Sequence, residues 1–246
     1  MRLRFMLMLA LSLPGAPAGA GEPNDEQPPF DAIDGYEQRA LEGWQVLVNR
    51  RLLAAERREL ADRALERLTD HLYRVRAVVP AEPLGELRRV PIWVEWQHPL
   101  HPGMCYHPDA DWLSEHGMNP AKARSVEVSN AENFLAWSID QPWMVLHELA
   151  HAYHHRVLGF DCAEIRAAYQ RAVESKRYES VLRGNGRRER AYALTDEKEY
   201  FAESTEAFFG TNDFAPFVRA ELAEHDPEML ALLRRVWRLD AAPPGP

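Results

Sequence analysis

The stretch Met144–His155, read MVLHELAHAYHH, constrains this chain more than any other because it places two histidines four residues apart. On an α-helix, residues at this spacing lie on one face, about 6 Å apart along the axis. Two imidazoles placed in this way can bind one ion at roughly 2.0–2.1 Å each. The pattern HExxH therefore predicts that His147 and His151 are zinc ligands.

Glu148 follows the first histidine, and we expect it to point to the side of the metal where a water would lie. Zinc lowers the pKa of such a water toward about 7, so that a carboxylate can take its proton and pass it to a leaving amine. Glu148 is the predicted general base. The alternative is an apolar core helix whose two histidines are satisfied by neighbouring carboxylates, since unpaired polar groups are costly inside a protein.

A catalytic zinc site needs a third protein ligand and an open position. One common arrangement places a histidine six residues after the second one. That position is Val157 here, and His154 occupies the position that is usually glycine. The third ligand must therefore come from elsewhere in the chain.

A glutamate on a later helix is the other common solution. The stretch Glu199–Glu203, read EYFAE, offers two carboxylates on one helical face. One can bind the metal while the other orients an imidazole. By the same helical-face argument, Glu203 or Glu206 could replace Glu199 as the ligand.

Together these motifs resemble those of the gluzincin metallopeptidases, and most of all the anthrax lethal factor family. The matching stretch runs from Tyr192 to Glu203, read YALTDEKEYFAE, and the resemblance covers roughly residues 124–209. It implies that Glu199 is the third zinc ligand, that Glu203 orients a zinc-bound histidine, and that Tyr192 donates its hydroxyl to the developing oxyanion. Such a donor lowers the barrier. Tyr192 could instead be an ordinary core tyrosine.

The resemblance implies a zincin-like α+β fold, with a small mixed or antiparallel sheet packed on a helical bundle and the HExxH helix at its centre. The expected protein is a secreted, monomeric zinc metallopeptidase that takes Zn²⁺ and a peptide or protein substrate. Two alternatives stay open. One is a zinc hydrolase of a non-peptide amide or ester. The other is a non-enzymatic exported zinc-binding protein.

The N-terminus predicts export. Arg2 and Arg4 precede the short apolar run Phe5–Leu13, and Ala18-Gly19-Ala20 is a small-residue cleavage site. We expect a signal peptide at 1–20 and a periplasmic or extracellular protein. A retained anchor is the alternative.

We expect a flexible lead-in at 21–29, a single domain at 30–240 and a disordered tail at 241–246. No membrane association is expected after cleavage. The formal net charge of −9 argues against a nucleic-acid partner.

Export bears on the two cysteines, because an oxidising compartment allows Cys105 and Cys162 to form a disulfide. The alternative is two separate buried thiols. Cys105 lies in an unusual loop that also holds His98, His101 and His107. Its spacing matches no specific zinc pattern. An irregular loop beside the cleft and a second metal site are the two interpretations.

Hydrophobic periodicity and turn residues predict the other elements. The predicted strands are 44–48, 91–96 and 124–129, and a hairpin is expected over 178–192. The predicted helices are 53–79, 131–137, 141–159 with Asp140 as N-cap, 162–176, 196–209, 214–224 and 227–239. We expect strand 124–129 to be the sheet edge to which an extended substrate adds.

Overall fold

The structure of the chain is a computed structural model that describes residues 30–98 and 101–240. The predicted signal peptide at 1–20, the lead-in at 21–29 and the tail at 241–246 lie outside the described residues. No helix in the described part of the chain has the length and apolar character needed to cross a membrane.

The fold is mixed α+β, in agreement with the expected class. Its strands are β1 (Tyr36–Leu41), β2 (Trp44–Asn49), β3 (Ile92–Val94), β4 (Met104–His107), β5 (Ser125–Val128), β6 (Val181–Leu182) and β7 (Arg188–Glu189). Its α-helices are α1 (Arg58–Val78), α2 (Ala81–Leu87), α3 (Ala110–Glu115), α4 (Ala131–Asp140), α5 (Met144–Tyr153), α6 (Ala163–Ser175), α7 (Glu197–Phe209), α8 (Arg219–His225) and α9 (Pro227–Val236).

The larger sheet has five strands in the order β1-β2-β3-β5-β4. Strands β2, β3 and β5 run parallel, while β1 and β4 lie antiparallel at the two edges. The prediction that strand 124–129 forms the edge was therefore wrong, because β5 is paired on both sides. The edge on that side is β4, which lies inside the proline-rich loop where no strand was predicted.

The two faces of this sheet are buried in different ways. Apolar side chains of β2, β3 and β5, such as Val46, Ile92 and Val126, join the main core with α1 and α5. The opposite face carries a small apolar cluster of Tyr36, Leu47 and Trp93 beside buried charged groups. Strand alternation separates these two sets of side chains.

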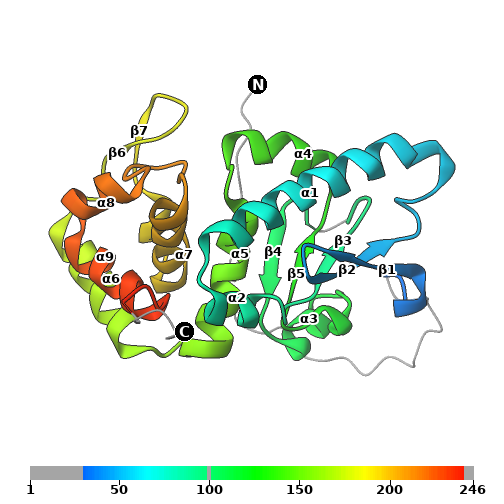
Figure 1. The fold of residues 1–246 in the computed structure, drawn as a ribbon, viewed down its shortest axis with the longest axis horizontal. Helices are drawn as coiled ribbons and strands as arrows, with labels where there is room; N and C mark the ends of the chain where they lie inside the picture. The colour runs from blue at the N-terminus through cyan, green and yellow to red at the C-terminus, as the bar shows by residue number, and fades with distance from the viewer. Residues whose placement is uncertain (1–29, 99–100, 241–246) are drawn as a thin grey trace, which may run out of the picture.

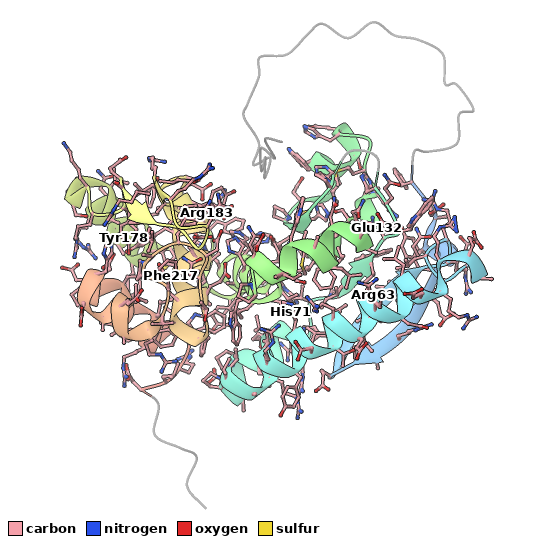
Figure 2. All side chains as sticks on the ribbon, turned by 90° about the horizontal axis from the view of Figure 1, so that it is seen from above. Arg63, His71, Glu132, Tyr178, Arg183 and Phe217 are labelled. Carbon is pink, nitrogen blue, oxygen red and sulfur yellow. The ribbon has the colours of Figure 1, made fainter. Side chains whose placement is uncertain are left out.

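The helices divide into two groups on either side of α5 (Figure 1). The sheet and helices α1, α3 and α4 lie on one side, α2 packs beside α5, and α6 to α9 with the β6–β7 hairpin lie on the other side. Viewed from above, Arg63, His71 and Glu132 lie in the first group and Tyr178, Arg183 and Phe217 in the second (Figure 2). Helices α5 and α7 pack against each other and join the two groups.

Several local predictions differ from the structure. Asp140 is the last residue of α4, so it does not cap α5, which begins at Met144 after an N-cap residue, Trp143, that makes no side-chain cap. A turn of π-helix, His154–Leu158, follows α5, and the next residue, Gly159, has a φ of 82° that favours glycine. Strand β1 and helices α2 and α3 were not predicted.

Candidate metal centre

Helices α5 and α7 bring three buried side chains to one point. His147 Nε2 lies 3.1 Å from His151 Nε2 and 3.0 Å from Glu199 Oε2, and His151 Nε2 lies 3.5 Å from the same oxygen. Ligand atoms roughly 2.0–2.1 Å from a tetrahedral zinc ion lie about 3.3 Å from one another. The three residues therefore match a zinc site in both ligand chemistry and spacing.

A buried polar atom without a partner supports this fit. Glu199 Oε1 has no hydrogen-bond partner among the described residues, although Glu199 is fully buried. Burial alone would raise the pKa of Glu199, but the charges and hydrogen bonds of His151 and His147 lower that pKa well below its usual value. A buried carboxylate oxygen without a partner is costly, and a cation bound between it and two imidazole nitrogens would remove that cost.

The local sequence explains why Glu199 reaches this position. Asp196 caps α7, because its carboxylate accepts hydrogen bonds from the backbone N–H groups of Lys198 and Glu199. Every residue of α7 from Glu199 onward is buried, so the helix is held on all sides. Helix α5 is buried along its whole length, which fixes the two histidines opposite the first turn of α7.

The second nitrogen of His147 is held by a carboxylate other than the one the resemblance implied. His147 Nδ1 lies 2.7 Å from Glu206 Oε1 and 3.7 Å from Glu203 Oε1. Glu203 instead accepts a hydrogen bond from Asn212 at 3.1 Å. A hydrogen bond from Nδ1–H to Glu206 leaves the Nε2 lone pair for a metal.

Glu148 is fixed by a contact of its own. Its Oε2 accepts a hydrogen bond from the backbone N–H of Tyr106 at 2.8 Å, so edge strand β4 fixes the carboxylate directly. Burial raises the pKa of Glu148, and the nearby His151 and His147 oppose this shift. The carboxylate can therefore present its other oxygen to a reacting proton.

Tyr192 opens a single 3₁₀ turn, Tyr192–Leu194, just before α7. Its hydroxyl is buried and has no hydrogen-bond partner in the described part of the chain. Burial raises the pKa of Tyr192, and the charges of Glu199, Glu148 and Glu203 raise it further. The hydroxyl is therefore a neutral donor within the field of the site's carboxylates.

The remaining sequence-predicted groups lie elsewhere. Both cysteines are free, so Cys105 and Cys162 form no disulfide. His154 is buried against Phe160 and Phe201, where burial lowers its pKa to about 3. His154 is a core histidine in this structure.

His98 and His101 lie near each other, with ring centroids 5.6 Å apart, and His101 Nε2 lies 3.0 Å from Met118 Sδ. His107 turns to the opposite sheet face and pairs with Glu127. These three histidines are not part of the α5–α7 site.

Two groups of this site were not assigned from the sequence. Glu206 was considered only as a substitute ligand, although residues 199, 203 and 206 share one helical face. Tyr106 contributes its backbone N–H to Glu148, and a pattern of side chains in the sequence does not indicate such a contact. No family model matches the chain, and neither the curated proteins nor the solved structures contain a match to it.

Proposed function

We propose that this protein is a zinc-dependent metallopeptidase of the gluzincin type, in which His147, His151 and Glu199 hold the metal. The observation that carries the proposal is the convergence of these three ligand atoms beside Glu148. A buried carboxylate next to an open metal site has a role in hydrolysis, whereas a purely structural site has no use for a base.

A zinc ion in this position supplies Lewis-acid chemistry, since it polarises a carbonyl group and makes water more acidic. Glu148 takes the proton from the attacking water and returns it to the leaving amine. The Tyr106 N–H holds one oxygen of this carboxylate at 2.8 Å, so the other oxygen is available for the proton. The geometry of β4 therefore sets the position of the base.

Tyr192 supplies the donor for the oxygen that gains negative charge during attack. Its buried hydroxyl has no competing partner among the described residues. A donor that is already in place costs no reorganisation when charge develops. Glu206 acts one step further away by fixing the ring of His147 through Nδ1.

Edge strand β4 is the element that we propose binds an extended peptide. It is the last strand of the sheet, antiparallel to β5, and it packs against α5. The N–H of Tyr106 points away from β5, toward Glu148. A peptide that adds to this edge through main-chain hydrogen bonds would pass directly over the base.

Cleavage of a mixed-peptide library by the purified protein tests this function, with Glu148→Gln as the matched variant. Gln keeps an oxygen for the Tyr106 N–H but cannot take a proton, so cleavage should fall about 10²–10⁴-fold. Equal cleavage by both proteins would contradict the mechanism. Normal metal binding without cleavage of any peptide would instead favour a non-peptide amide or ester as the substrate.

A further inference from the structure

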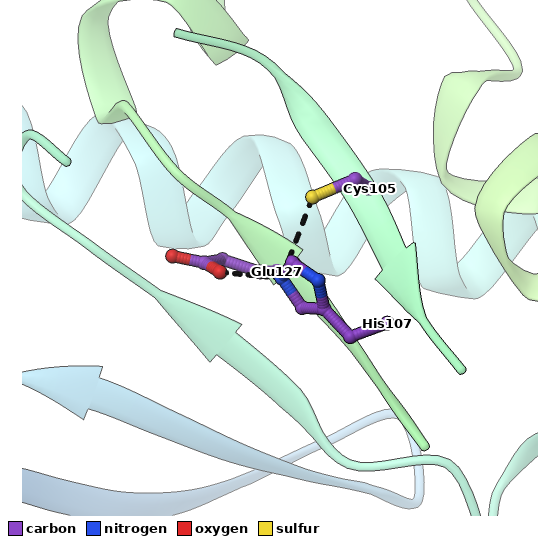
Figure 3. Close-up of side chains that lie close together, drawn as sticks. All are labelled: Cys105, His107 and Glu127. Carbon is purple, nitrogen blue, oxygen red and sulfur yellow. Dashed lines mark hydrogen bonds and ion pairs between the residues drawn. The ribbon is translucent and has the colours of Figure 1, made fainter. Parts of the chain in front are cut away.

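A second group of metal-ligating side chains lies on the sheet face opposite α5. Strand β4 contributes Cys105 and His107, and β5 contributes Glu127, which is paired with Cys105 across the two strands. His107 Nε2 lies 2.6 Å from Glu127 Oε2 and 3.4 Å from Cys105 Sγ (Figure 3). Sulfur, nitrogen and oxygen atoms from three residues therefore surround one point.

The geometry does not fit a nucleophilic triad. In a Cys–His–carboxylate triad the thiol and the carboxylate contact different nitrogens of the ring. Here Cys105 and Glu127 both approach the same atom, Nε2 of His107. The sulfur, this nitrogen and the carboxylate oxygen thus face a common point, as the ligands of one metal ion do.

We propose that Cys105, His107 and Glu127 bind a second divalent transition-metal ion, with zinc as the ion that the ligands fit best. Thiolate, imidazole and carboxylate are all zinc ligands, at about 2.3, 2.0–2.1 and 2.0–2.2 Å. For tetrahedral angles these lengths put sulfur and nitrogen roughly 3.5 Å apart, close to the 3.4 Å between Cys105 and His107. The His107–Glu127 contact must lengthen by roughly 0.8 Å as its proton leaves.

The buried charges around the site favour a divalent ion. Lys122 Nζ lies 2.6 Å from both Glu127 and Glu95, so Glu127 already has a cationic partner on its other oxygen. Metal ligands of these types bind as thiolate, neutral imidazole and carboxylate, so a divalent ion displaces the protons that they carry. The protons released offset part of the charge that the ion brings into a buried region, where an uncompensated charge is costly.

The position of the site gives it a consequence for the first centre. Its ligands come from both β4 and β5, so the ion would tie the edge strand to the sheet. Tyr106 lies between the two ligands of β4, and its N–H holds Glu148. The ion would lie on one face of the strand, while the base is held at the strand's outer edge.

Cobalt(II) binding to the metal-free protein tests the proposal, because this site contains a sulfur ligand and the α5–α7 centre does not. We expect the wild-type protein to bind two ions and to show thiolate-to-cobalt charge-transfer absorption. Cys105→Ser should lose one ion and the whole charge-transfer band. Cys162→Ser is the matched control and should keep both. Glu199→Ala should lose an ion from the first centre but retain the band, which separates this proposal from the proposed function.

Two results would overturn the proposal. One is a wild-type protein without the charge-transfer band, and the other is a band that survives in Cys105→Ser. Thermal unfolding of each metal-free variant checks that the proteins compared are folded. Cys105 is only half-buried, so its replacement by serine removes the sulfur with little change in packing.

Discussion

Nδ1 of His147 lies 2.7 Å from Oε1 of Glu206, on the opposite side of the ring from the nitrogen that faces Glu199. Glu203, one helical turn earlier, lies 3.7 Å from the same Nδ1 and is hydrogen-bonded to Asn212. Glu206 therefore orients the imidazole, while Glu203 belongs mainly to the packing behind it.

This difference predicts unequal effects of two matched substitutions. Glu206→Ala should weaken zinc binding about 10–100-fold, because His147 loses the partner that fixes its tautomer and ring. Glu203→Ala removes a buried carboxylate from the same helix and should have a smaller effect. Competition with a zinc chelator measures both affinities. An equal or larger loss in Glu203→Ala would reverse the assignment.

Tyr192→Phe should lower kcat about 10²–10³-fold and leave zinc binding unchanged. Because the Tyr192 hydroxyl has no hydrogen-bond partner in the described structure, its removal should not reduce stability. Tyr200→Phe is the contrasting control. The Tyr200 hydroxyl donates to Asp226 at 2.6 Å, so its loss should cost about 1.5–3 kcal/mol. Unchanged kcat in Tyr192→Phe would show that Tyr192 is only a core residue.

His71 gives the fold a pH dependence that is separate from the metal centre. It is buried on α1, and burial, with Arg74 and Arg67 nearby, lowers its pKa from 6.5 to about 3. Between these values the unfolded chain takes up a proton and the folded protein does not. The stability that comes from neutral His71 is therefore complete above pH 6.5 and falls as the pH drops toward 3.

The variant His71→Leu should lack this contribution. Its free energy of unfolding, relative to wild type, should rise on acidification by up to about 1.4 kcal/mol per pH unit. Urea unfolding at neutral and mildly acidic pH measures the difference. A constant difference between the two proteins at all these pH values would mean that His71 titrates normally in the fold.

The elements that carry strong local signals could be predicted from the sequence. The helix predicted over 196–209, with two glutamates at helical spacing, is present as Glu197–Phe209. The HExxH segment is likewise a buried helix. These signals are local, since they depend on the spacing of residues along one helix.

The parts that were missed depend on tertiary contacts. Strand β4 is four residues long and lies within a proline-rich segment, so its pairing with β5 is what makes it a strand. Strand β1 has one buried residue, Tyr36, so it lacks the apolar–polar alternation by which a half-buried strand is recognised. The choice between Glu203 and Glu206 needs the distance to His147, which spacing along one helical face does not give.

Zinc content of the purified protein, measured for wild type beside Glu199→Ala and Glu148→Gln, tests the central claim most directly. Each of the three proteins is prepared with Cys105→Ser as a common background, so that only zinc in the α5–α7 centre is counted. We expect one zinc ion in this background, none after Glu199→Ala, and one after Glu148→Gln together with loss of peptide cleavage. No zinc in the background protein, or zinc that survives Glu199→Ala, would contradict it.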